Sequence, residues 1–133
     1  MPAEVIAALD ASLDDERKAE ATYIAVIDKL DPVAPFSAIL EAERQHAAKV
    51  IALYQARNLA VPANSWVGRG TAADTLIDNC KIGVAAEEEN IAMYDRLLAS
   101  LPSGNDDVVQ VFLALQAASR DNHLPAFRQC AGL

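Results

Sequence analysis

The sequence predicts an all-α protein, an antiparallel bundle of four helices with one long crossover between the second and third helices. First, apolar residues recur at alternating spacings of three and four, which is the heptad pattern of packed helices. Second, the composition is helical, since 53% of the 133 residues are hydrophobic and only five are Gly. Third, the links between the periodic stretches are short, long and short, the order of two antiparallel hairpins joined end to end. The length is that of one domain, 1–133.

The first hairpin is expected over residues 9–57. The Asp31–Pro32 pair ends its first helix, because a residue before Pro is disfavoured in the α region. Pro35 fits the first turn of the second helix, which ends near Arg57. The inward-facing positions of the first helix are Leu9, Leu13, Glu16, Glu20, Tyr23, Ile27 and Leu30. Those of the second helix are Phe36, Ile39, Glu43, His46, Val50 and Leu53.

Residues 59–73 form the crossover, since they show no periodicity and contain Pro, Asn and Gly. At about 3.3 Å per residue they can extend roughly 50 Å, the length of a bundle. Trp66 is expected to anchor this segment or to form a dimer contact. The third helix begins near Asp74, with inward-facing Ile77, Cys80, Val84, Glu87, Ile91, Tyr94, Leu98 and Leu101. After a turn at 102–106, in which Asn105 or Asp106 can cap the next helix, the inward-facing positions are Val109, Leu113, Gln116, Arg120, His123, Phe127 and Cys130.

The charge balance excludes several classes of partner. The net charge is −8 and no basic patch is visible, so neither nucleic acid nor an anionic membrane surface is an expected partner. No apolar run reaches the roughly 18 residues of a membrane span. The N-terminus lacks the features of a signal peptide. A cytoplasmic location is therefore the default expectation, with export as the alternative if a signal peptide had been trimmed from the chain.

The two cysteines, Cys80 and Cys130, exclude a rubredoxin or zinc-ribbon centre, which needs four thiolates or a close mixture with His. The start of the third helix and the end of the fourth meet in an antiparallel hairpin, so a disulfide is geometrically feasible. Two buried thiols are nevertheless the expectation for a reducing cytosol.

Inward-facing carboxylates are the most informative feature of the pattern. Glutamates are almost never fully buried unless they are paired or bind a metal. Two carboxylates about 4 Å apart repel each other by roughly 4 kcal/mol at an effective dielectric constant of 20, so a converging group needs a positive charge between its members. In di-metal four-helix bundles of the ferritin-like kind, two helices each supply one Glu and the other two each supply a Glu-x-x-His. Five of these six positions are present here: Glu16, Glu43, His46, Glu87 and His123.

The sixth position is Arg120, which cannot bind a metal because its guanidinium has no free lone pair and stays protonated. Three explanations stay open. Glu20 can supply the missing carboxylate from the next turn of the first helix. Arg120 can replace one metal ion by an ion pair, leaving one ion or none. A π-turn near Pro125, which lacks an N–H, can rotate Asp121 into the vacant position.

The two hairpins repeat each other. Glu16 precedes Tyr23 by seven residues, and Glu87 precedes Tyr94 by seven. Such a repeat implies a pseudo-twofold axis, with a site that draws on both halves. Both tyrosines are expected to be core aromatics whose hydroxyls bond the carboxylates and orient them.

The chain resembles the rubrerythrin-type branch of the ferritin-like superfamily, and more closely an uncharacterised ferritin-like family of bacteria and archaea. The matching segments span about residues 11–127 and read "DDERKAEATYIAVIDKL", "PFSAILEAERQH", "VAAEEENIAMYDRLL" and "LQAASRDNHLPAF". The resemblance implies a ferritin-like bundle with a non-haem di-iron or related site that handles dioxygen, peroxide or iron itself. Arg120 departs from the pattern and puts the full set of ligands in doubt.

The functional expectation is therefore a metal-binding oxidoreductase, a di-iron or manganese protein acting on dioxygen or peroxide, whose enzymatic status is left open. Its metal ligands would be Glu16, Glu20, Glu43, His46, Glu87 and His123, supported by Tyr23, Tyr94 and Arg120. Two other classes compete with it: a structural or interaction bundle that has lost its metal, with Arg120 neutralising the carboxylates, and an iron-binding protein without turnover. A homodimer is expected, and a separate electron-donor protein or small reductant would supply any electrons.

Overall fold

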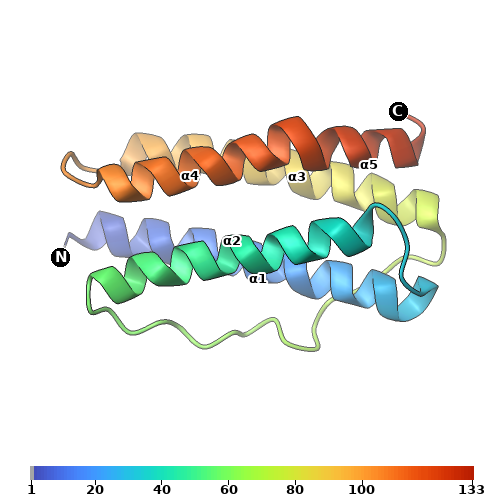
Figure 1. The fold of residues 1–133 in the computed structure, drawn as a ribbon, viewed down its shortest axis with the longest axis horizontal. Helices are drawn as coiled ribbons and strands as arrows, with labels where there is room; N and C mark the ends of the chain where they lie inside the picture. The colour runs from blue at the N-terminus through green and yellow to red at the C-terminus, as the bar shows by residue number, and fades with distance from the viewer. Residues whose placement is uncertain (1) are drawn as a thin grey trace.

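The computed structural model describes residues 2–133. It is all-helical in this range and contains no strand, so the expected all-α bundle of four helices is confirmed (Figure 1). The first three helices are α1 (Ala3–Leu30), α2 (Phe36–Ala56) and α3 (Leu76–Ser100). The fourth is one continuous rod in three parts, α4 (Asp106–Ala118), the π-helical turn η1 (Ser119–His123) and α5 (Leu124–Ala131).

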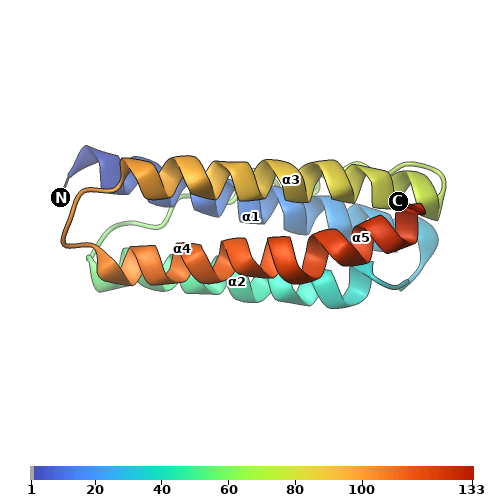
Figure 2. The ribbon, with the colours of Figure 1, turned by 90° about the horizontal axis from the view of Figure 1, so that it is seen from above.

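The helices form two hairpins that lie side by side along their lengths. Helices α1 and α2 run in opposite directions and pack against each other, as do α3 and the α4–η1–α5 rod (Figures 1 and 2). Contacts between α1 and α3 and between α2 and α4 close the bundle. The segment between α2 and α3 runs along the bundle, as the sequence predicted. It is held to α1 where Trp66 Nε1 donates to Asp14 (2.9 Å) and Arg17 donates to the Pro62 carbonyl (2.7 Å).

The helix ends follow local rules only in part. Thr75 caps α3, because its hydroxyl accepts the Asp78 N–H at 3.1 Å. Asn105 stands at the N-cap of α4, but its side chain donates to the carbonyls of Pro102 and Ser103 and caps nothing. Gly132 ends α5 in the left-handed region, at a φ of 76°, which glycine adopts without steric cost.

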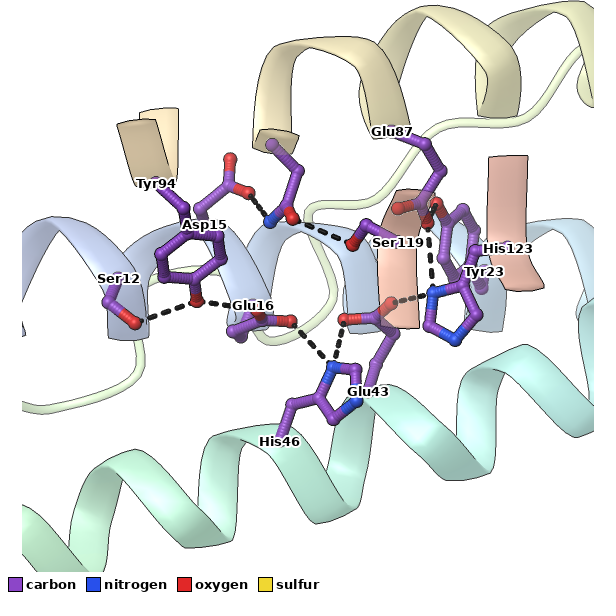
Figure 3. A network of polar contacts seen from close by, with 11 residues as sticks. Ser12, Asp15, Glu16, Tyr23, Glu43, His46, Glu87, Tyr94, Ser119 and His123 are labelled. Carbon is purple, nitrogen blue, oxygen red and sulfur yellow. Dashed lines mark hydrogen bonds and ion pairs between the residues drawn. The ribbon is translucent and has the colours of Figure 1, made fainter. Parts of the chain in front are cut away.

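Two apolar clusters fill the bundle on either side of a polar layer. One cluster lies towards the N-terminal end of α1 and contains Leu9, Val50, Tyr94 and Phe112 among its buried members. The other lies towards the α1–α2 turn and includes Tyr23, Phe36 and Phe127, whose rings touch at centroid distances of 5.1–5.6 Å. Buried glutamates and histidines from α1, α2, α3 and η1 lie between the two clusters (Figure 3).

The heptad pattern predicted the inward face of the first half of α4 with a one-residue error, whereas Gln116 is buried as expected. Val108, Phe112 and Leu115 are buried, whereas Leu113, expected inside, is 50% exposed. The physical reason is the π-turn at Ser119–His123, which inserts one extra residue into the helical repeat. Counting back from His123 with α-helical spacing therefore gives the wrong face. Ile77, in the first turn of α3, was also expected inside and is 53% exposed.

The expectation of two free thiols is wrong. Cys80 of α3 and Cys130 of α5 form a disulfide, with their Cα atoms 5.8 Å apart. The start of α3 and the end of α5 meet in the second hairpin, which brings the two Cα atoms into the usual range for a disulfide. The disulfide thereby ties the two helices of this hairpin together beside the second apolar cluster. Among residues 2–133, none of the helices combines the length and apolar character that crossing a membrane requires.

Candidate metal centre

Five of the residues predicted from the sequence converge in the polar layer as two groups of three. Glu16, Glu43 and His46 form the first group, and Glu43, Glu87 and His123 form the second. In each group, one potential ligand atom from every member lies within 4.8 Å of the others, and all members are buried. Glu43 belongs to both groups. Figure 3 shows its carboxylate between the two histidines.

The two oxygens of Glu43 face different histidines. Oε2 lies 3.7 Å from His46 Nδ1, which is also 3.5 Å from Glu16 Oε2. Oε1 lies 3.2 Å from His123 Nδ1, which is also 3.4 Å from Glu87 Oε1. The two imidazoles stack, with ring centroids 5.6 Å apart and planes inclined by 20°. The carboxylate of Glu43 therefore joins two similar half-sites.

Three ligand atoms of the cluster are buried without a hydrogen-bond partner among residues 2–133: Glu16 Oε2, His46 Nδ1 and His123 Nδ1. Buried polar atoms are paired in the great majority of proteins, so each exception needs an explanation. Each histidine nitrogen here approaches two carboxylates at similar distances instead of aligning with one of them. Side chains that surround a common cation would show the same arrangement.

Tyrosine hydroxyls hold the outer carboxylates in a crossed pattern. Tyr94 of α3 donates to Glu16 of α1 at 2.8 Å, and its oxygen also lies 2.9 Å from the Ser12 hydroxyl. Tyr23 of α1 donates to Glu87 of α3 at 3.1 Å. The expected hydrogen bonds between the tyrosines and the carboxylates are therefore present. Each half of the repeat fixes a glutamate of the other half, as Figure 3 shows.

Burial and crowding displace the pKa values of the cluster. Burial first, and the charge of Glu43 second, raise the pKa of Glu16 from its usual 4.5 to about 8. Burial alone would raise the pKa of Glu43 too, but the contacts with Glu16, His123 and His46 outweigh it, so that this pKa is lowered. Burial alone would lower the histidine pKa values, yet the nearby carboxylates raise them to about 9 for His46 and about 10 for His123. Protons or metal ions must therefore balance the buried carboxylates.

Helix four supplies a serine where the template has a glutamate. The π-turn leaves Ser119 buried, and its hydroxyl donates to Asn90 Oδ1 at 2.7 Å. Asn90 in turn donates to Asp15 at 2.7 Å. Sequence reasoning missed Ser119. The signal that could have found it was Pro125, because a π-turn near Pro125 was one of the three explanations for Arg120 at the sixth position. The turn is present, but it brings Ser119 inward instead of Asp121.

The expected role of Arg120 beside the carboxylates is wrong. Its guanidinium pairs with the carboxylate of Asp121, at 3.0 and 3.2 Å, and the side chains of both residues are more than half exposed. The extra residue of the π-turn rotates this pair to the surface of the bundle. Arg120 therefore neither replaces a metal ion nor neutralises the buried glutamates, and Asp121 does not take a ligand position.

Glu20 also lies outside both groups. It is half-buried and lines a groove beside the crossover, together with Arg17 and Trp66. At 3.6 residues per turn, a residue four positions beyond Glu16 is rotated by about 40° around the helix. That rotation turns Glu20 towards the crossover and away from Glu43, so the structure does not support a sixth carboxylate from α1.

The comparisons with known proteins bear on the fold alone. No protein-family model matches the chain, and no curated protein matches it. The chain is similar to a solved structure titled hypothetical protein MJ0754 from Methanococcus jannaschii, with a TM-score of 0.87 and 22% sequence identity. The match covers 99% of this chain and 82% of the other. Together, the fold and the site define a four-helix bundle with a buried glutamate–histidine cluster at its centre.

Proposed function

We propose that the protein is a ferritin-like metalloprotein that binds a pair of iron or manganese ions between its four helices. Glu16 and His46 would hold one ion, Glu87 and His123 the other, and Glu43 would contribute to both sites. The observation that carries this proposal is the pair of three-residue groups that share Glu43, in which three buried ligand atoms have no partner among residues 2–133.

The order and direction of the helices support the ferritin-like assignment. Two hairpins joined by a crossover along the bundle are the arrangement of ferritin-like proteins with one long connection. In these bundles, the side chains of facing helices build the metal site in the core. Glu43 and His46, three residues apart on α2, project from the same face of that helix.

The set of donors favours iron or manganese. Carboxylate and imidazole ligands suit these metals, whereas thiolate ligands would favour zinc or an iron–sulfur cluster. Both cysteines are engaged in the disulfide, so neither is a ligand. When bound, such a pair of ions supplies one-electron redox chemistry towards dioxygen or peroxide. The chain itself orients Glu16 and Glu87 through the tyrosines and holds the ligands between its two apolar clusters.

The alternative, a bundle that has lost its metal, lacks the contact on which it depended. That interpretation needed Arg120 beside the buried carboxylates, and Arg120 pairs with Asp121 at the surface. The pKa values of the cluster offer protons as the remaining counter-charge in a metal-free protein. Metal analysis separates the two functions directly.

The test is the metal content of the purified protein after incubation with Fe²⁺ or Mn²⁺ under anaerobic conditions. We expect about two ions per chain, as in di-metal bundles, and almost none in Glu43→Gln, because this substitution removes the one ligand that both half-sites share. Glu41→Gln, an exposed glutamate on the same helix, is the matched control and should keep both ions. A wild-type protein that takes up no metal, or equal contents in the two variants, would contradict the proposal.

The redox part of the proposal has a test of its own. Oxygen added to the Fe²⁺-loaded wild type should consume the ferrous iron, measured with a ferrous-specific chelating dye, and change the near-ultraviolet absorption. The same additions to Glu43→Gln should oxidise iron only at the rate of free Fe²⁺ in buffer. Iron that is bound but oxidised at that same background rate would leave a metal-binding protein without redox turnover.

A further inference from the structure

A cavity of about 390 Å³ lies between α1 and α3 and reaches the candidate metal centre. Its buried lining consists of Tyr23, Glu43, Glu87 and Asn90. Figure 3 shows Tyr23, Glu43 and Glu87 close together. The walls nearer the solvent are mainly small or apolar and contain Ala19, Thr22, Ile82, Ala85 and Ala86. Glu16, His46 and His123 do not line it, so the cavity opens on one side of the centre.

The cavity is a consequence of small side chains on two facing helices. Ala19 of α1 faces the cavity from one side, and Ala85 and Ala86 of α3 face it from the other. The space opens to solvent beside Ile82 and Ala85, which are both exposed. Leucines at these positions would fill the space. A cavity of this size beside a cluster of buried charges falls within the range of ligand pockets, about 300–1,000 Å³.

The size of the cavity exceeds the needs of dioxygen or peroxide. A water molecule occupies about 30 Å³ in the liquid, so the space equals the volume of about thirteen waters. A diatomic molecule would fill a small part of it. A ring or a short chain with one polar group would fill most of it.

The charges around the cavity disfavour an anionic ligand. Two carboxylates form its inner end, Asp15 and Glu89 also line it, and the chain carries a net charge of −8. Lys18 is the single basic residue of the lining, and its ammonium lies over the Trp66 ring of the crossover, 5.6 Å from the ring centroid. The lining thus offers apolar walls and hydrogen-bond partners near Tyr23, without a free cation.

We propose that this cavity binds a small neutral organic molecule, a phenol or a short alcohol in its chemical class, beside the Glu43–Glu87 side of the metal centre. The proposal rests on the proposed function in one respect, since it places the bound molecule beside the proposed metal pair. Its polar group would lie at the buried end with Tyr23, and its apolar part would lie against the alanines.

The binding test uses the metal-free protein and three probes: phenol, 1-hexanol and benzoate. Saturation-transfer NMR should detect phenol and hexanol, and should detect benzoate much more weakly because of its charge. Ala86→Leu should weaken phenol binding by about tenfold or more, which corresponds to about 1.4 kcal/mol. Ala19→Leu, on the opposite wall, should do the same. Ala52→Leu, an exposed position on α2, is the matched control and should bind phenol like the wild type.

The position of the ligand is tested with metal-loaded protein. In Mn²⁺-loaded protein, the paramagnetic ion should broaden the phenol resonances strongly, whereas Zn²⁺-loaded protein should not broaden them. Circular dichroism verifies that each variant is folded, and its metal content verifies that the centre is intact.

The outcomes separate this inference from the proposed function. Three results would overturn the cavity proposal and leave the metal centre standing. They are no phenol binding to the wild type, unchanged phenol binding in both wall variants, and no Mn²⁺ broadening of phenol in metal-loaded protein. A protein that binds no metal would overturn the proposed function, and the metal-free titrations would then decide the cavity alone.

Discussion

Helix α2 and the rod of α4, η1 and α5 occupy equivalent places in the two hairpins, but they build their halves of the centre differently. In α2, the regular helix places Glu43 and His46 on one face, three residues apart. In the rod, the π-turn places Ser119 and His123 inside, four residues apart, and leaves Arg120 at the surface. One inserted residue therefore brings Ser119 inside where the di-metal template has a glutamate, and keeps the histidine inside.

The difference shows which parts of the repeat both halves keep. The crossed contacts of Tyr23 and Tyr94 with the opposite glutamates are preserved in both halves, and so is the pair of stacked imidazoles. Only the carboxylate of the second Glu-x-x-His is missing. Because Glu43 directs one oxygen at each histidine, a single carboxylate can serve both half-sites.

The strongest test of this comparison removes one histidine at a time. His46→Ala should lose the ion of the first half-site and keep the other, because Glu43, Glu87 and His123 remain together. His123→Ala should do the reverse. Metal analysis of both variants should give about one ion per chain where the wild type gives about two. Loss of both ions in either variant would show that the half-sites do not bind independently.

His46→Ala and His123→Ala also test whether the two half-sites differ in their access to solvent. The cavity between α1 and α3 reaches Glu43 and Glu87 but not Glu16 or His46. A chelator should therefore remove the ion held with His123 first, giving a fast and a slow phase in the wild type. His123→Ala should abolish the fast phase, and His46→Ala the slow one. A single phase in the wild type, equal to that of each variant, would refute this difference in access.

The second prediction concerns pH. In the metal-free protein at pH 7, Glu16, His46 and His123 hold protons, since their pKa values are about 8, 9 and 10. Metal ions bind the deprotonated ligands. Binding two ions should therefore release about three protons per chain at pH 7, and affinity should increase with pH up to about 10, the pKa of His123. Calorimetry in buffers of different ionisation enthalpy measures the released protons.

The stability of the metal-free protein should change with pH in the opposite direction. These three pKa values are raised on folding from ordinary values of 4.5 for Glu16 and 6.5 for the histidines. Their contribution to stability is thus complete below those ordinary values and is lost as pH rises through about 8, 9 and 10. Urea unfolding at pH 6 and pH 9.5 should show the loss without metal and a smaller one with metal. Equal stability at both pH values without metal would contradict the assignment of the protons.

The third prediction addresses the position that differs between the halves. Ser119→Ala removes the donor to Asn90 Oδ1, and leaving that buried acceptor unpaired should cost about 1 to 2 kcal/mol in the free energy of unfolding. Ser12→Ala is the matched control from the first half. Its partner Tyr94 keeps the hydrogen bond to Glu16, so the loss should be smaller. Both variants should keep the metal content of the wild type, because neither hydroxyl is a ligand.

The sequence predicts the fold and most of the candidate site because both depend on the same periodicity. All six inward-facing positions of α2 are buried, and five of the six metal-ligand candidates converge between the helices. The buried glutamates were recognisable because a charged side chain in an apolar stripe needs a partner. Whether a metal is that partner is decided by the metal analysis.

The errors come from features that periodicity does not encode. The π-turn depends on the carbonyls that lack an N–H partner because Pro125 has none. It also depends on the hydrogen bond between Ser119 and Asn90, which are far apart in the sequence. Glu20 differs from Glu16 by a small rotation of α1, which a heptad count ignores. The disulfide depends on how close the ends of α3 and α5 lie in three dimensions, and a default about redox compartment could not supply that distance.

The last prediction has the smallest expected effect and separates the two accounts of helix four. Arg120→Ala removes an exposed ion pair with Asp121, and such pairs contribute little to stability. The urea midpoint, the metal content and the proton release should therefore match those of the wild type. If Arg120 neutralised the buried carboxylates, its removal would instead increase metal uptake and lower the stability of the metal-free protein. Ser119→Ala should lower the free energy of unfolding, whereas Arg120→Ala should leave it unchanged. This contrast between adjacent positions reports directly which side chain the π-turn directs inward.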